Sequence, residues 1–143
     1  MRCFYSLLAC AALNGVVLIA GSVRADAGQR TACEVLPVAT VSAALGAQLE
    51  THEVRTPSPN GGISYTCAYL GPQKQATVMV AYDTTPAMAA ADRDGWNRVR
   101  GAGGGSDSGI AGTKGSVAVM IDVHQHTSEA TLKRLLAAAL SNL

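Results

Sequence analysis

The sequence predicts an α+β domain, in which a mainly antiparallel sheet of about four strands carries two to three helices on one face and one disulfide bond. Residues 63–82 contain two alternating apolar segments separated by a turn, which is typical of a β-hairpin. Residues 128–143 carry leucines at helical spacing. Two cysteines, Cys33 and Cys67, lie in the part of the chain that we expect to fold.

The first 27 residues have the features of an export signal. Arg2 supplies a positive charge, and an apolar run follows from Cys3 to Val23. Ala25 and Ala27 have the spacing that a leader peptidase requires. We therefore expect residues 1–27 to be a signal peptide that takes no part in the fold.

Removal of this leader leaves residues 28–143, a length that fits one small domain. We expect that domain to be periplasmic or secreted, with a cut near Ala25 or Ala27. Two alternatives stay open: the leader is an uncleaved membrane anchor, or Cys10 carries a lipid, because Leu7-Leu8-Ala9 precedes it with a small residue at the end.

The leader also determines which cysteines remain in the exported domain. Cys3 and Cys10 lie within it, so Cys33 and Cys67 remain in the exported domain. Two cysteines in an oxidising compartment most simply pair with each other. The loop that they would close is about 35 residues long, and the entropy of closing it corresponds to about 4 kcal/mol of stabilisation.

The exported domain begins with residues 28–32, which we expect to be a short mobile start, and a helix that opens at Pro37 follows. Val38, Val41 and Leu45 fall on one face at spacings of three and four residues. Gly46 stands where such a helix ends.

Three strands are predicted next. A weak strand covers Gln48–Arg55, and the proline- and glycine-rich residues 56–62 form a loop. Residues 63–70 alternate well between apolar and polar types, as do residues 76–82 after the turn at 71–74. This pair is the predicted hairpin.

A second helix starts at Thr85-Pro86, where a capping residue is followed by proline at the first helical position. It runs to about Arg98, and its thin apolar face suggests that Trp96 anchors it to the sheet. Residues 101–112 are so rich in glycine that we expect a flexible loop there.

The strongest strand pattern in the chain covers residues 116–125, where valine and isoleucine alternate with other residues. The last helix begins near Ser128. Its apolar side is formed by Leu132, Leu135, Leu136, Ala139, Leu140 and Leu143, and Lys133 and Arg134 lie on the other side.

Charge argues against nucleic acid as a partner. The whole chain has 11 Lys and Arg against 10 Asp and Glu, a net charge of +1, and neither sign is clustered. Nucleic-acid-binding domains need a basic patch or stripe. We therefore expect a protein or envelope ligand instead.

The residues of this chain do not have the spacing that the common catalytic and phosphate-binding motifs require. The run Gly101–Gly105 has Ser106 where a dinucleotide-binding loop needs glycine, and it lacks the Gly-Lys-Ser/Thr of a phosphate loop. Ser106-Asp107-Ser108-Gly109 is not embedded in a nucleophile elbow. The carboxylates are scattered singly, which offers no acid–base pair. We expect a protein that is not an enzyme and uses no cofactor.

Asp122, His124 and His126 form the most suggestive polar set. Alternate residues of a strand share one face, so all three would project together as possible zinc ligands. The simpler interpretation is the solvent-facing side of a half-buried strand.

Two loops are candidates for recognition, because binding residues are often carried by loops on a rigid scaffold. They are the segments 56–62 and 101–112. Within them we select Pro57, Pro59, Asn60, Gly103, Gly104, Ser106 and Asp107.

Short motifs between residues 33 and 82 resemble those of a known protein class. Cys33-Glu34-Val35-Leu36, a helix ending in Ala43-Ala44-Leu45-Gly46, and Tyr65-Thr66-Cys67-Ala68-Tyr69 before a valine-rich strand are similar to small exported bacterial domains of unknown function. That class is frequent in actinobacteria and often lipid-anchored. The resemblance implies a Cys33–Cys67 bridge but no activity. This chain departs from it in having no lipid-attachment cysteine directly before the domain.

These expectations describe an exported, non-enzymatic binding protein of the bacterial envelope, with an inhibitor or immunity protein for a secreted toxin or envelope enzyme as one form of it. The alternatives are a metal-binding periplasmic protein that uses Asp122, His124 and His126, and a structural envelope lipoprotein.

Overall fold

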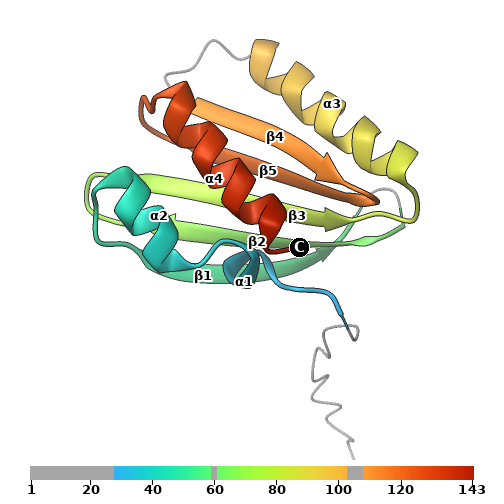
Figure 1. Cartoon of the computed structure of the whole chain (residues 1–143), viewed down its shortest axis with the longest axis horizontal. Coiled ribbons are helices and arrows are strands. Elements are labelled where there is room, and N and C mark those ends of the chain that lie inside the picture. Colours follow the sequence, from blue (N-terminus) through green and yellow to red (C-terminus); the bar gives the residue numbers. More distant parts are fainter. Residues whose placement is uncertain (1–27, 59–60, 103–107) are drawn as a thin grey trace, which may run out of the picture.

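The computed structural model describes residues 28–58, 61–102 and 108–143, which form a five-stranded antiparallel sheet and four helices (Figure 1). In chain order the elements are α1 (Ala32–Val35), α2 (Val38–Leu45), β1 (Glu50–Pro57), β2 (Ile63–Leu70), β3 (Gln75–Tyr82), α3 (Pro86–Ala102), β4 (Ser108–Lys114), β5 (Val117–Val123) and α4 (Glu129–Ser141). The predicted α+β class and antiparallel sheet are confirmed. In the described ranges, no helix is both long enough and apolar enough to span a membrane.

The strands follow the order β1-β2-β3-β5-β4 across the sheet. The predicted hairpin of β2 and β3 is present, with Cys67 opposite Val78 and Ile63 opposite Tyr82. After β3 the chain passes through α3 to the far edge and returns as the hairpin of β4 and β5, which places β5 beside β3. The edges are therefore β1 and β4.

One face of the sheet carries the main core. Successive side chains of a strand point to opposite faces, and this face collects the larger ones, such as Tyr69, Val78 and Ile121. They pack against α1, α2 and α4, and Leu135 of α4 is 1% exposed. Figure 1 shows α4 lying across the sheet with α1 and α2 beside it.

The opposite face is covered by α3 at β4 and β5, so the expectation that the helices share one face is wrong for this helix. Ala81, Ala118 and Met120 alternate with the core residues of the same strands and pack against Ala89 of α3. Trp96 packs against this cluster, as expected of an anchor, but on the second face. Small side chains on the strands allow the helix to approach closely.

The prediction of a flexible loop over residues 101–112 is also wrong in part, because α3 extends to Ala102 and β4 begins at Ser108. The glycines of β4 make room for helices on both faces. A Cβ atom on Gly109 would lie 2.6 Å from Trp96 Cη2, and one on Gly112 would lie 3.1 Å from Leu136 Cδ2. This strand raises the count from the expected four to five.

The helix ends follow the sequence signals. Gly46 caps α2 in the left-handed region at φ 64°, and the Ser128 side chain accepts a hydrogen bond from the Thr131 amide at the start of α4. The short helix α1 was not predicted. Its capping box is formed by Thr31 and Glu34, each side chain accepting a hydrogen bond from the other's backbone amide.

Candidate functional site

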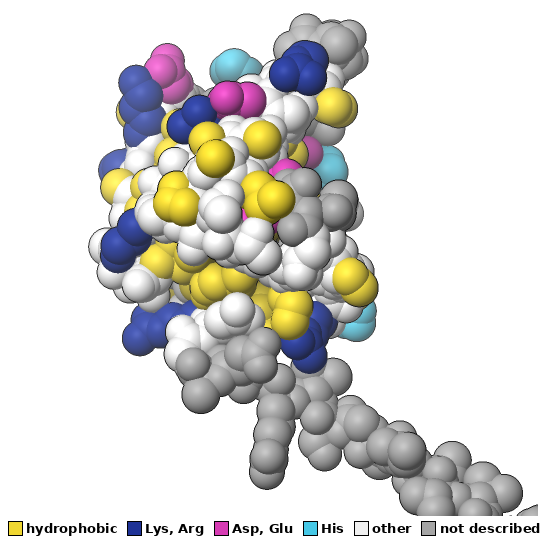
Figure 2. Space-filling model, turned by 90° about the vertical axis from the view of Figure 1, so that its right-hand side faces the viewer, with side chains coloured by type: hydrophobic (Ala, Val, Ile, Leu, Met, Phe, Trp, Pro, Cys, Tyr) yellow, Lys and Arg dark blue, Asp and Glu magenta, His cyan; other side chains and the backbone are white. Residues whose placement is uncertain are grey.

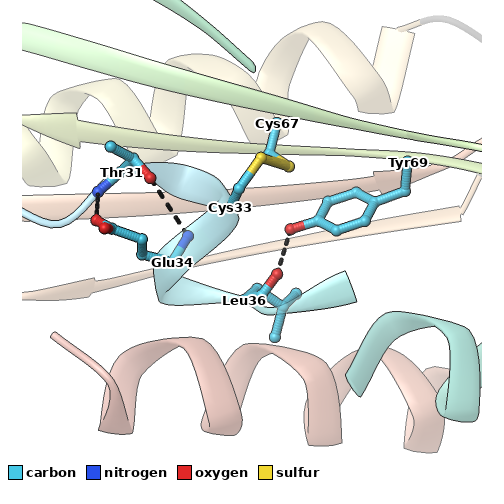
Figure 3. The surroundings of a disulfide bond; sticks show 6 residues. All are labelled: Thr31, Cys33, Glu34, Leu36, Cys67 and Tyr69. Carbon is cyan, nitrogen blue, oxygen red and sulfur yellow. Dashed lines mark hydrogen bonds between the residues drawn. A yellow bond between two sulfur atoms is a disulfide. The ribbon is translucent and has the colours of Figure 1, made fainter. Parts of the chain in front are cut away.

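The Cys33–Cys67 disulfide fixes the start of the described domain to the sheet, as predicted. It joins α1 to the buried centre of β2 (Figure 3). Beside it, the Tyr69 hydroxyl donates a hydrogen bond to the Leu36 carbonyl directly after α1. Burial, and secondarily the Glu53 carboxylate, raise the pKa of Tyr69, so its hydroxyl stays a donor at neutral pH. Together these contacts hold the segment that precedes α1 against one end of the sheet.

That segment places Arg30 next to Tyr82, at the end of β3. The Tyr82 hydroxyl accepts a hydrogen bond from the Arg30 amide at 2.9 Å and donates one to the Arg30 carbonyl at 2.8 Å. Burial is the main cause that raises the pKa of Tyr82. The Arg30 guanidinium donates to the Asn142 carbonyl at 2.9 Å. An open hollow of about 520 Å³ lies here, lined in part by Arg30, Tyr82, Val117 and Asn142.

A second hollow lies on the same face of the sheet, closer to β1. Its volume is about 320 Å³, and it is lined by Arg55, Thr56, Pro57 and Ile63. The guanidinium carbon of Arg55 lies 5.8 Å from the centre of the Tyr65 ring, within the range of a cation–π contact. Each of the two hollows therefore has an arginine in its wall.

Tyr65, Tyr82 and Ile63 connect the two hollows. The Tyr65 and Tyr82 rings meet edge to face, with centroids 6.1 Å apart, and Ile63 is the register partner of Tyr82. We call the set Arg30, Arg55, Ile63, Tyr65 and Tyr82 the tyrosine–arginine surface. Figure 2 looks at this end of the sheet, where hydrophobic side chains gather low on the face between Lys or Arg side chains on either side.

The Tyr65 hydroxyl stands out within this surface. It is buried, and no described residue forms a hydrogen bond with it. A buried polar group without a partner costs free energy, so such groups are rare in native proteins and call for an explanation. The tyrosine–arginine surface thus contains a hydroxyl whose partner is not among the described side chains.

The chemical groups of this surface indicate which kinds of ligand it could contact. It offers two cationic guanidinium groups, the half-buried Tyr82 ring, which packs on the buried Tyr65 ring, and an aliphatic side chain. Guanidinium groups recognise carboxylates by charge-assisted hydrogen bonds, and aromatic rings supply large contact areas at little entropic cost. The arrangement suits an acidic ligand with an apolar part.

The structure gives no support to the proposed metal set. Asp122 forms an ion pair with Arg100 of α3. The strand β5 ends at Val123, so His124 and His126 do not continue the face that Asp122 occupies. Over the ranges that the structure describes, no group of three His, Cys, Asp or Glu residues is placed to hold a metal ion.

Of the predicted recognition residues, only Pro57 can be placed. It ends β1 and lines the smaller hollow. The others, Pro59, Asn60, Gly103, Gly104, Ser106 and Asp107, lie outside the described residues.

Sequence reasoning missed the rest of the tyrosine–arginine surface. Tyr65 and Tyr82 were placed correctly on strands, but alternation assigns tyrosine to a core face without showing that one end of that face is open. Arg30 lies in the segment 28–32, for which a mobile start was predicted; that prediction is wrong for Arg30, because its backbone forms two hydrogen bonds with the Tyr82 hydroxyl. A useful signal was present in β1, where Arg55 and Pro57 share a face in a strand with few apolar residues.

Comparison with known proteins adds no relative: no family model, no curated protein and no solved structure matches this chain.

Proposed function

We propose that this protein is an exported, non-enzymatic binding protein of the bacterial envelope, and that it recognises an acidic segment of a protein ligand with the tyrosine–arginine surface. An inhibitor or immunity protein for a secreted toxin or envelope enzyme is the form of this function that we favour. The observation that carries the proposal is the pairing of two tyrosine rings between two hollows with arginine walls.

The residue types support this proposal. Tyrosine and arginine are enriched at the energetic centres of protein interfaces, where an aromatic ring fills a pocket and a guanidinium pairs with a charge. The chain itself carries nearly balanced charge, so affinity for an acidic ligand must come from local groups and not from the net field.

Rigidity of the scaffold supports it as well. The disulfide, the Thr31–Glu34 capping box and the Tyr82 hydrogen bonds hold Arg30 in place before any ligand arrives. A surface that is ordered in advance loses less conformational entropy on binding. An inhibitor or immunity protein benefits from this, because it must bind tightly through a small area.

The test compares two charge reversals. Full-length chains carrying Arg30→Glu or Arg98→Glu are produced by export, immobilised and exposed to envelope and culture fractions of the source cells. We expect a defined ligand that binds the unchanged protein and the Arg98→Glu control, since Arg98 is exposed on α3. Arg30→Glu should reduce its capture at least tenfold. Equal capture by both variants would contradict the proposed surface.

A further inference from the structure

The strand β1 presents an open edge. Across the described part of the chain it pairs with β2 alone. Six of its eight side chains are exposed, and only Glu53 and Arg55 are half-buried. Val54 is 46% exposed although it is aliphatic. An exposed edge strand has a row of free backbone donors and acceptors, which makes it a template for another strand.

Charged side chains are one of the means by which native edge strands are protected from pairing with a second copy. The charges of β1 have both signs, so their effect depends on the register. When two copies of one strand pair antiparallel around a two-fold axis, residues of the same face meet and one residue lies on the axis. A register centred on Glu53 opposes two glutamates, and one centred on Arg55 opposes two arginines.

The register centred on Val54 is different. Glu53 of each copy then stands opposite Arg55 of the other, and both belong to the same face of the sheet. Val54 meets its own symmetry mate on the opposite face, and His52 meets Thr56. Directly opposed residues of opposite charge stabilise a strand pair, and like charges destabilise it. This register contains two favourable ion pairs and no like-charge pair.

Glu53 provides an independent observation. Its Oε1 atom is buried and finds no hydrogen-bond partner among the described residues. Oε1 itself stays unpaired in the proposed dimer, but an arginine of a second copy that pairs with the other carboxylate oxygen offsets part of this cost, because charge-assisted hydrogen bonds are stronger than neutral ones. Within one copy, Arg55 lies two residues along the strand, with its guanidinium against the Tyr65 ring.

We propose that two copies of this chain pair antiparallel through β1, with Val54 on the two-fold axis, so that the two sheets become one continuous sheet. The partner is a second copy because the edge is complementary to itself in this register. The contact is smaller than the roughly 1,600 Å² of a standard interface, so we expect a reversible dimer with a dissociation constant on the order of 10 µM. This proposal does not depend on the proposed ligand.

Cysteine cross-linking tests the register. Full-length chains carrying Val54→Cys, His52→Cys or Thr56→Cys are exported, purified and oxidised mildly. The protein concentration is about 50 µM, above the expected dissociation constant, so that most of the protein is dimeric. In the proposed register, two cysteines at position 54 lie within disulfide range. At position 52 or 56 the two copies' cysteines are about 13 Å apart along the strands. We expect a covalent dimer from Val54→Cys alone.

Equal cross-linking of all three variants, or of none, would overturn the proposal. Peptide mapping must also show the bond between two copies of position 54, with Cys33 still joined to Cys67. An exchange that involves Cys33 or Cys67 would count against the proposal as well.

Sedimentation equilibrium then tests the energetics. We expect Val54→Lys to raise the dissociation constant at least tenfold, because it places two lysines on the axis. Val99→Lys is the matched control, since Val99 is 74% exposed on α3. Glu53→Lys and Arg55→Glu should each weaken the dimer, and the double variant should restore it. Circular dichroism establishes that each variant is folded, and Val54→Lys serves if charge reversal at Glu53 prevents folding.

Three results would contradict the dimer: an unchanged protein that stays monomeric up to about 500 µM, well above the expected dissociation constant; equal weakening by Val54→Lys and Val99→Lys; or no recovery in a folded double variant.

Discussion

The two faces of the sheet are stabilised by different means. On one face, α1, α2 and α4 bury large aliphatic and aromatic side chains, and a disulfide ties α1 to the central part of β2. On the other, α3 rests on a small cluster of alanines and methionine at β3 and β5. The first face combines covalent, polar and hydrophobic contacts, whereas the second depends on close approach of backbone to helix.

The tyrosine–arginine surface belongs to the first face, where the scaffold is most strongly held. α3 belongs to the second, where the Arg100 guanidinium both pairs with Asp122 and lies over the Trp96 ring at 4.9 Å. The comparison indicates that the tyrosine–arginine surface is held rigidly while α3 is the element most easily displaced. Four substitutions or pairs of substitutions test this difference between the faces.

Loss of the disulfide should have the largest effect. Replacing both cysteines, Cys33→Ala with Cys67→Ala, should lower the free energy of unfolding by about 4 kcal/mol, because the unfolded chain regains the entropy of the open loop. Urea denaturation followed by circular dichroism measures the change. A loss below about 1 kcal/mol would show that the bridge does not dominate the stability of the first face.

Truncation of one buried side chain on each face comes next. Leu135→Ala should cost about 3 kcal/mol, because Leu135 is 1% exposed in the main core. Trp96→Ala should cost about 2 kcal/mol, less than a fully buried tryptophan, since Trp96 is only partly buried. Urea unfolding must be followed by circular dichroism, because Trp96 is the only tryptophan. A larger cost for Trp96→Ala would reverse the ranking of the faces.

Two glycine substitutions test the close approach of α3. Gly109→Ala should destabilise the protein by about 1 kcal/mol, because the new Cβ would lie 2.6 Å from Trp96 Cη2. Gly95→Ala, within α3 itself, should stabilise it by about 1 kcal/mol, because its Cβ meets nothing within 4 Å and alanine favours the helix. Thermal unfolding of both variants measures these changes. Shifts of the melting temperature in the same direction would contradict the proposed close approach of α3 to β4.

The smallest expected effect is at Tyr65. Tyr65→Phe removes a buried hydroxyl that has no described partner, so the free energy of unfolding should stay the same or rise by up to about 1 kcal/mol. Urea denaturation measures it. A loss of more than about 1 kcal/mol would mean that the hydroxyl is already satisfied in the folded protein.

The sequence predicted those elements whose local pattern matches their packing. β2 was placed at its observed bounds, and α2 and α4 were found from their apolar spacing and end signals. β1 was predicted two residues early, because its exposed side chains give alternation little apolar signal. The disulfide followed from the predicted leader, which leaves two cysteines.

What the sequence did not predict depends on contacts between distant segments. β4 contains Gly109 and Gly112, and glycines in sequence indicate a loop. Only the structure shows that helices pack closely against these two residues. The position of α3 on the second face depends on strand order, which a local pattern does not contain. The tyrosine–arginine surface likewise arises because Arg30 meets Tyr82, residues far apart in the chain.

Native-state hydrogen exchange tests the contrast between the faces most directly. The account predicts that amides of α3 exchange through local opening, well before those of β2 and β3, and that the β3 amides near Tyr82 exchange only on global unfolding. Adding reductant should accelerate exchange at α1 and β2 and leave α3 nearly unchanged. Amides of α3 as protected as those of β2 would contradict the claim that the molecule holds the tyrosine–arginine surface more firmly than α3.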